Sequence, residues 1–209
     1  MQTQTTRITL RFTVVLIAAL FLFGNPALTA ARQDAAAIGP VTPAPADCIV
    51  DARTADSVIA IFAAATPVAD PAASPDVTIP LGDPAETAVV TEITSLIHQA
   101  FACLNAGDYL RFLNLLTDQA VVTNFSWVGE MIVNGELPSE LTEPVAMNPD
   151  SQQTILGIGA VTQVADGSIT AVVVFIDPSA EEAVSALHLT LLQDGDRWLI
   201  DRAIDFHND

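Results

Sequence analysis

The residues whose types and spacing could do chemistry lie mostly near the carboxyl end of the chain. His188 and Asp201 fall on two neighbouring strand-like segments, in a register that would place them opposite each other. A His and an Asp in contact form the orienting half of a catalytic triad. No motif marks a Ser or Cys nucleophile that would complete such a triad. We therefore interpret the two residues as a surface ion pair.

Arg202 interrupts an apolar alternation that includes Trp198 and Ile200, so we expect it to point into an internal cavity. A buried guanidinium needs a carboxylate partner or an anionic ligand. The alternatives are that Arg202 reaches the cavity rim or pairs with a structural acid. On the ligand-binding interpretation, the candidate contacts are Trp127, Leu187, Trp198 and Arg202. Core packing is the alternative role for both tryptophans.

Searches for established catalytic motifs give no match. The chain has no HExxH, no GxSxG, no phosphate-binding loop and no zinc-ligand cluster. Gly157-Ile158-Gly159 is a lone GxG within a strand pattern, which indicates a bend or close packing. We therefore assign no catalytic residue and expect no cofactor and no metal.

Cys48 and Cys103 are the only cysteines. In an exported chain an isolated pair is most simply a disulfide. A metal pair or a redox couple is the alternative, but there is no CxxC spacing and no third ligand nearby. We predict a structural disulfide that closes a loop of 55 residues.

The amino terminus has the pattern of a secretory signal. Arg7 and Arg11 precede an apolar run, 12–23, which is followed by helix breakers and small residues. The run spans only ~18 Å, too short for a stable membrane anchor. We predict a signal peptide at 1–31, a flexible Ala/Pro-rich linker at 32–47 and one domain at 48–209 containing a Pro-rich loop at 66–84. The protein is expected to be secreted or otherwise extracytoplasmic.

Composition excludes one class of partner. The 209 residues include 25 acidic side chains, seven arginines and no lysine. Removing the predicted signal leaves 25 acids against five arginines, a formal charge of −20. Nucleic-acid binding requires clustered basic side chains, so we expect no nucleic-acid partner.

Helical patterns come first in the domain. Asp83, Pro84 and Glu86 resemble an N-cap, an N1 proline and an N3 acid, so a long amphipathic helix is predicted from here to about Leu104. Shorter helices are predicted at 55–65 and 109–117. The pattern changes beyond residue 117, where the run 120–128 is β-branched and aromatic.

Strand patterns follow, at 153–164, 168–176, 184–193 and 197–206, with Asp-Gly hairpin signals at 166–167 and 194–195. A two-residue turn at 194–195 would pair Leu191 with Trp198, Leu189 with Ile200 and Leu187 with Arg202. This order of elements predicts an α+β fold.

Two stretches and the order of elements resemble a known family. The helix joint Ala102-Cys103-Leu104-Asn105-Ala106-Gly107-Asp108-Tyr109-Leu110-Arg111-Phe112 and the hairpin Asp194-Gly195-Asp196-Arg197-Trp198-Leu199-Ile200 are similar to the nuclear transport factor 2-like superfamily, particularly its SnoaL-like members. The resemblance implies a cone-shaped, curved antiparallel sheet wrapped round the long helix, with an apolar cavity. Members include cyclases, isomerases, dehydratases and proteins without known activity, so the fold does not define a function.

Three functions are therefore carried forward. The leading hypothesis is a non-catalytic exported domain that binds a small apolar or amphipathic molecule or acts as an interaction module. The first alternative is an enzyme of the cyclase, isomerase or hydrolase kind using unidentified cavity residues. The second is a structural dimerisation domain, because Val161, Val172, Val174 and Ile176 indicate a second apolar sheet face and hence a possible homodimer.

Overall fold

The computed structural model describes residues 39–65, 82–134, 136, 138–180 and 183–206. The predicted signal peptide and most of the 66–84 loop lie outside the described residues. The described part of the predicted linker packs onto the domain: Val41 exchanges two 2.8 Å backbone hydrogen bonds with Ile155, and a 3-10 turn, η1, follows at Pro45–Asp47. The ordered domain therefore includes residues that the sequence analysis assigned to the linker.

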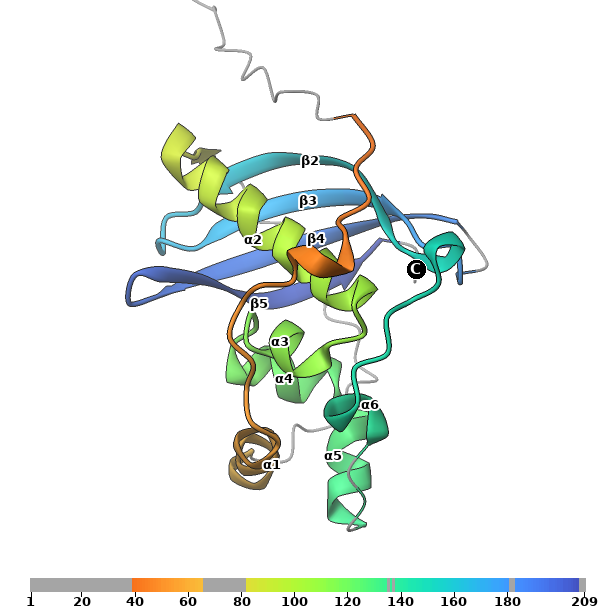
Figure 1. Ribbon diagram of the computed structural model, residues 1–209. Helices are drawn as coiled ribbons and strands as arrows, with labels where there is room; N and C mark the ends of the chain where they lie inside the picture. The colour runs from red at the N-terminus through yellow and green to blue at the C-terminus, as the bar shows by residue number, and fades with distance from the viewer. Residues whose placement is uncertain (1–38, 66–81, 135, 137, 181–182, 207–209) are drawn as a thin grey trace, which may run out of the picture. The chain divides into compact units, whose positions relative to one another are not determined.

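The domain contains one antiparallel sheet in the order β1-β2-β3-β4-β5 (Figure 1). Its strands are β1 Asp83–Pro84, β2 Thr154–Gln163, β3 Ile169–Ile176, β4 Val184–Asp194 and β5 Arg197–Asp205. The four predicted strands are confirmed. Gly167 and Gly195 have φ of 90° and 65° at the two hairpin turns, a conformation that glycine adopts without steric cost.

The described helices are α1 Ala55–Ala64, α2 Thr87–Asn105, α3 Tyr109–Leu113, α4 Asp118–Asn124, α5 Ser126–Val133, α6 Ser139–Thr142 and the 3-10 turn η2 Pro149–Ser151. Three of these helices have an N-cap residue whose side-chain oxygen accepts a backbone hydrogen bond. Thr54, Asp108 and Thr117 accept hydrogen bonds from backbone amides in the first turns of α1, α3 and α4. The α+β class is confirmed.

The long helix begins later than predicted. Asp83 and Pro84 pair with the end of β2 as a short edge strand, and Glu86 is the N-cap of α2. Proline is compatible with such an edge position because its missing N–H need not join the ladder. Tertiary pairing therefore overrides the local capping pattern.

Two further boundaries differ from the sequence prediction. The helix expected at 109–117 ends at Leu113, because Leu115 and Thr117 each share a 2.9 Å backbone hydrogen bond with Ile200 of β5. The β-branched run 120–128 is helical, lying in α4 and α5. Helix caps and burial of its apolar side chains outweigh the weak β preference of those residues.

The core lies between α2 and one face of the sheet, here called the inner face. Figure 1 shows α2 lying across the strands. Ile93, Ile97 and Phe101 of α2 are buried, and the Phe101 ring meets Phe175 of β3 edge-on at 5.1 Å between centroids. The length and apolarity of α2 would suit a membrane span, but this apolar stripe packs against the inner face.

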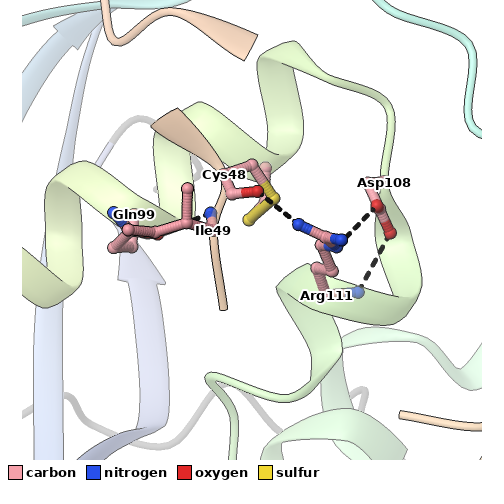
Figure 2. Close-up of a disulfide and its surroundings, with 6 residues drawn as sticks. Cys48, Ile49, Gln99, Asp108 and Arg111 are labelled. Carbon is pink, nitrogen blue, oxygen red and sulfur yellow. Dashed lines mark hydrogen bonds and ion pairs between the residues drawn. A yellow bond between two sulfur atoms is a disulfide. The ribbon is translucent and has the colours of Figure 1, made fainter. Parts of the chain in front are cut away.

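The predicted disulfide is present and holds the amino-terminal segment against α2 (Figure 2). Both Cys48 and Cys103 are buried. Arg111 donates a 2.6 Å hydrogen bond to the Cys48 carbonyl and pairs with Asp108 at 3.2 Å. On the same segment, the amide of Ile49 donates to Gln99 of α2 (3.2 Å). The bond therefore belongs to a wider attachment of this segment to α2 and α3.

Asn105, at the end of α2, fixes a second part of that segment. Its side chain is fully buried, and its amide donates to the carbonyls of Pro43 (2.9 Å) and Gln153 (3.1 Å) while its oxygen accepts from the Gln153 amide (2.8 Å). The side chain thus satisfies three backbone groups that helix and strand pairing leave without partners.

Candidate functional site

The β4–β5 register differs from the prediction. Gly195 and Asp196 form the turn, so Leu191 pairs with Ile200 and Gln193 with Trp198. A β-bulge at Asp201 then shifts the pairing again. The predicted pairs Leu191–Trp198, Leu189–Ile200 and Leu187–Arg202 are therefore wrong.

The bulge determines where Arg202 lies. Arg202 pairs with Thr190, whose side chain is on the opposite face from Leu189 and Leu191. Because successive side chains alternate between faces, the extra residue at Asp201 moves Arg202 to the face away from α2, where it is exposed. The expectation that Arg202 points into the apolar interior is wrong.

The four candidate ligand contacts are not gathered in one place. Leu187 and Trp198 are half-buried on the inner face, but their positions are about 20 Å apart along the strands. The Trp198 indole donates to Glu92 of α2 at 3.0 Å. Trp127 lies on α5 and is 42% exposed, and Arg202 is on the other face. Ligand binding by each residue stays a prediction.

None of those four residues lines either of two hollows on the described part of the chain. The larger, about 720 Å³, lies between the start of α1 and the β4–β5 hairpin. Its most buried cation, Arg53, is already bound to Asp118 (2.6 Å) and to the carbonyls of Leu113 (2.9 Å) and Leu116 (2.7 Å). Arg53 therefore joins α1 to the α3–α4 connection. The smaller hollow, about 560 Å³, adjoins Gly82 and the β2–β3 turn.

His188 does not form the surface ion pair with Asp201 that was predicted from the sequence. It pairs with Ile204, is only 3% exposed, and neither ring nitrogen has a hydrogen-bond partner among the described residues. Asp201 instead accepts a 2.8 Å hydrogen bond from the Thr117 hydroxyl. Burial lowers the pKa of His188, because removal from water disfavours the charged imidazole. An unpartnered buried imidazole costs stability.

His188 belongs to a side of the sheet that we call the outer face, which points away from α2. Strand pairing arranges this face in rows that cross β2, β3, β4 and β5. The central rows are Gly157–Val174–Ala186–Phe206, Gly159–Val172–His188–Ile204 and Thr162–Thr170–Thr190–Arg202. None of these residues belongs to the apolar cluster between α2 and the inner face. Arg202 is the single charged residue in these rows.

The relief of the outer face is uneven. A Cβ placed on Gly157 or Gly159 would meet no atom within 4 Å, so the β2 end of two rows is open. At the other end, the Phe206 side chain is 42% exposed and its ring meets His188 edge-on at 6.3 Å. The face therefore has a hollow end and a protruding end.

The second apolar face was predicted in part. Val172, Val174 and Ile176 alternate onto the outer face, but Val161 is buried in the core cluster. The irregularity between Gly159 and Thr162 moves Val161 to the inner side. Small or apolar residues at every second position of the strands indicated this face in the sequence. The bulges, which determine the side of the sheet on which later side chains lie, left no sequence signal that we recognised.

Catalytic and metal-binding arrangements are not seen in the described parts of the chain. No group of three or more His, Cys, Asp or Glu side chains there could hold a metal ion. His188, whose pKa is lowered by burial, lies beside the Phe206 ring. The outer face is the candidate functional surface because two of its rows contain only glycine, aliphatic, aromatic and imidazole side chains.

No protein-family model matches this chain, and no curated protein or solved structure matches it.

Proposed function

We propose that this protein is an exported, non-catalytic interaction module that binds its partner through the outer face of its sheet. We also propose a nuclear transport factor 2-like fold. The long helix packed across an antiparallel sheet supports this part of the proposal. The buried disulfide supports an extracytoplasmic location, because such bonds persist in oxidising compartments.

The observation that carries the proposal is the composition of the outer face. Two rows spanning four strands contain only glycine, aliphatic, aromatic and imidazole side chains. A solvated sheet face normally alternates to polar and charged side chains, and this chain has 25 acidic residues with which to do so. A contiguous apolar face without carboxylates is typical of an interaction surface.

The enzyme alternative has less support. It requires two convergent titratable side chains in a cavity, and the hollow beside α1 places Arg53 and Asp118 in a mutual ion pair. That pair is accounted for by its role in joining α1 to α4. The leading hypothesis also included binding of a small molecule, which requires the predicted contacts to converge, and Trp198 and Arg202 lie on opposite faces.

Site-specific photo-cross-linking in the living host tests the proposal. A photoreactive residue replaces Val174 on the outer face, and the same residue replaces Val145 as a matched control, since Val145 is an exposed valine in a connecting segment. The expected result is a covalent adduct from position 174 that is absent from position 145. Equal or no adduct formation at the two positions would refute an interaction surface on the outer face.

A further inference from the structure

Arg202 differs from the other arginines that the structure describes, because it lacks a carboxylate partner. Each of the others forms an ion pair: Arg53 with Asp118, Arg111 with Asp108 and Arg197 with Asp194. Arg202 is exposed and makes no hydrogen bond or ion pair with the described residues, although the chain has 25 acidic side chains. The outer face therefore presents a cation that the described part of its own chain does not neutralise.

A second polar side chain without a partner lies next to Arg202. Because Arg202 pairs with Thr190 and His188 with Ile204, His188 is the diagonal neighbour of Arg202 across β4 and β5. Diagonal neighbours on one face of an antiparallel pair lie about 7–8 Å apart, within reach of a long side chain. Both ring nitrogens of His188 are buried and lack a hydrogen-bond partner among the described residues. Two polar groups without partners are thus adjacent at the border of the apolar rows.

A carboxylate is a group that both side chains can bind. A guanidinium donates two parallel hydrogen bonds that match the two carboxylate oxygens, and a neutral imidazole donates one from the ring nitrogen that carries the proton. The central rows of the outer face contain no carboxylate, so the molecule bound there has to supply it. Building on the proposed function, we propose that the partner is a different protein whose apolar docking surface places one carboxylate against Arg202 and His188.

Phe206 controls access to the imidazole. Its ring meets His188 edge-on at 6.3 Å and is 42% exposed, at the end of the described part of β5 and its flanking turn. The carboxylate reaches the buried ring nitrogens when the Phe206 ring turns aside, and the ring then packs against apolar side chains of the partner. Binding gives the imidazole the partner that it lacks, which offsets part of the cost of removing the charged groups from water.

Dependence of the cross-link on Arg202 tests the proposal. The photoreactive residue at position 174 is combined with Arg202→Gln in the full chain, in the living host. We expect the yield of the adduct to fall at least about tenfold, because truncating one partner of a desolvated charge pair costs at least this much affinity. Arg202→Lys keeps the charge without the forked geometry and should lose less. His188→Leu removes the imidazole N–H but keeps an apolar side chain, and should lower the yield about fivefold.

A matched control and a charge exchange complete the test. Arg197→Gln removes another arginine of β5, which pairs with Asp194 at the hairpin, and should leave the yield unchanged. Mass spectrometry of the adduct identifies the partner peptide, and changing its Asp or Glu to Arg should restore the adduct with Arg202→Glu.

The outcomes separate this proposal from the interaction surface itself. A wild-type yield from folded Arg202→Gln, an equal loss in Arg197→Gln, failure of the charge exchange or an adduct with twice the mass of this chain would overturn the carboxylate partner, while the outer face would stand as an interaction surface. Absence of any adduct from position 174 in the wild type would refute the interaction surface and the carboxylate partner together.

Discussion

Removal of the disulfide should produce a large loss of stability. In the variant C48A/C103A, the unfolded chain gains the freedom of an open loop of 55 residues. The chain-entropy treatment converts this into about 4 kcal/mol at 25 °C. For a domain of this size, each kcal/mol corresponds to about 2–4 °C, so the melting temperature should fall by about 8–16 °C. The folded state should remain, because α2 and the sheet keep their core.

Urea unfolding distinguishes this entropic effect from damage to the native state. Opening the loop exposes more surface in the unfolded ensemble, so the slope of free energy against urea should increase while the midpoint falls. Arg111→Gln is the control, because it removes the hydrogen bond to Cys48 and the pair with Asp108 but keeps the loop closed. It should cost only ~1 kcal/mol. A loss below ~1 kcal/mol in C48A/C103A would refute the reasoning.

Three further predictions concern single buried positions. Burial lowers the pKa of His188 in the folded state, so the unfolded chain binds a proton at this residue more readily. The free energy of unfolding should therefore fall as the pH drops below the unfolded pKa of ~6.5. His188→Leu should make that fall smaller between pH 7 and 5, as measured by urea titrations. Asn105→Ala should cost at least ~2 kcal/mol by calorimetry, because it leaves backbone groups of Pro43 and Gln153 unpaired; an unchanged melting curve would contradict this. Gly107→Ala should cost ~2 kcal/mol or more, since Gly107 has φ of 62° and an added Cβ would collide with the Val145 carbonyl; wild-type stability would show that this contact yields.

Periodicity predicted the main elements of the fold. The apolar stripe that includes Ile93, Ile97 and Phe101 defined the long helix, and alternation with two Asp-Gly signals defined the meander. Because the chain has only two cysteines, their pairing in a disulfide could also be predicted. Hydrophobic periodicity and turn signals are local, and the pairing of the two cysteines follows from an oxidising compartment. These features can therefore be predicted without knowledge of the tertiary structure.

The side of the sheet on which each side chain lies could not be predicted, because it depends on β-bulges. One extra residue at Asp201 moves Arg202 from the expected inner side to the outer face, and an irregularity after Gly159 moves Val161 the other way. Each bulge reverses every side chain beyond it. His188 was placed beside Asp201 because the turn was predicted at 194–195 when it lies at 195–196, and the bulge shifts the pairing once more, so that His188 pairs with Ile204.

The most direct test of the outer face as an interaction surface is the comparison of photo-cross-linking from Val174 with photo-cross-linking from Val145 in the living host. We expect a covalent adduct with a partner from position 174 and none from position 145. Equal adduct formation at the two positions, or no adduct at either, would contradict the account.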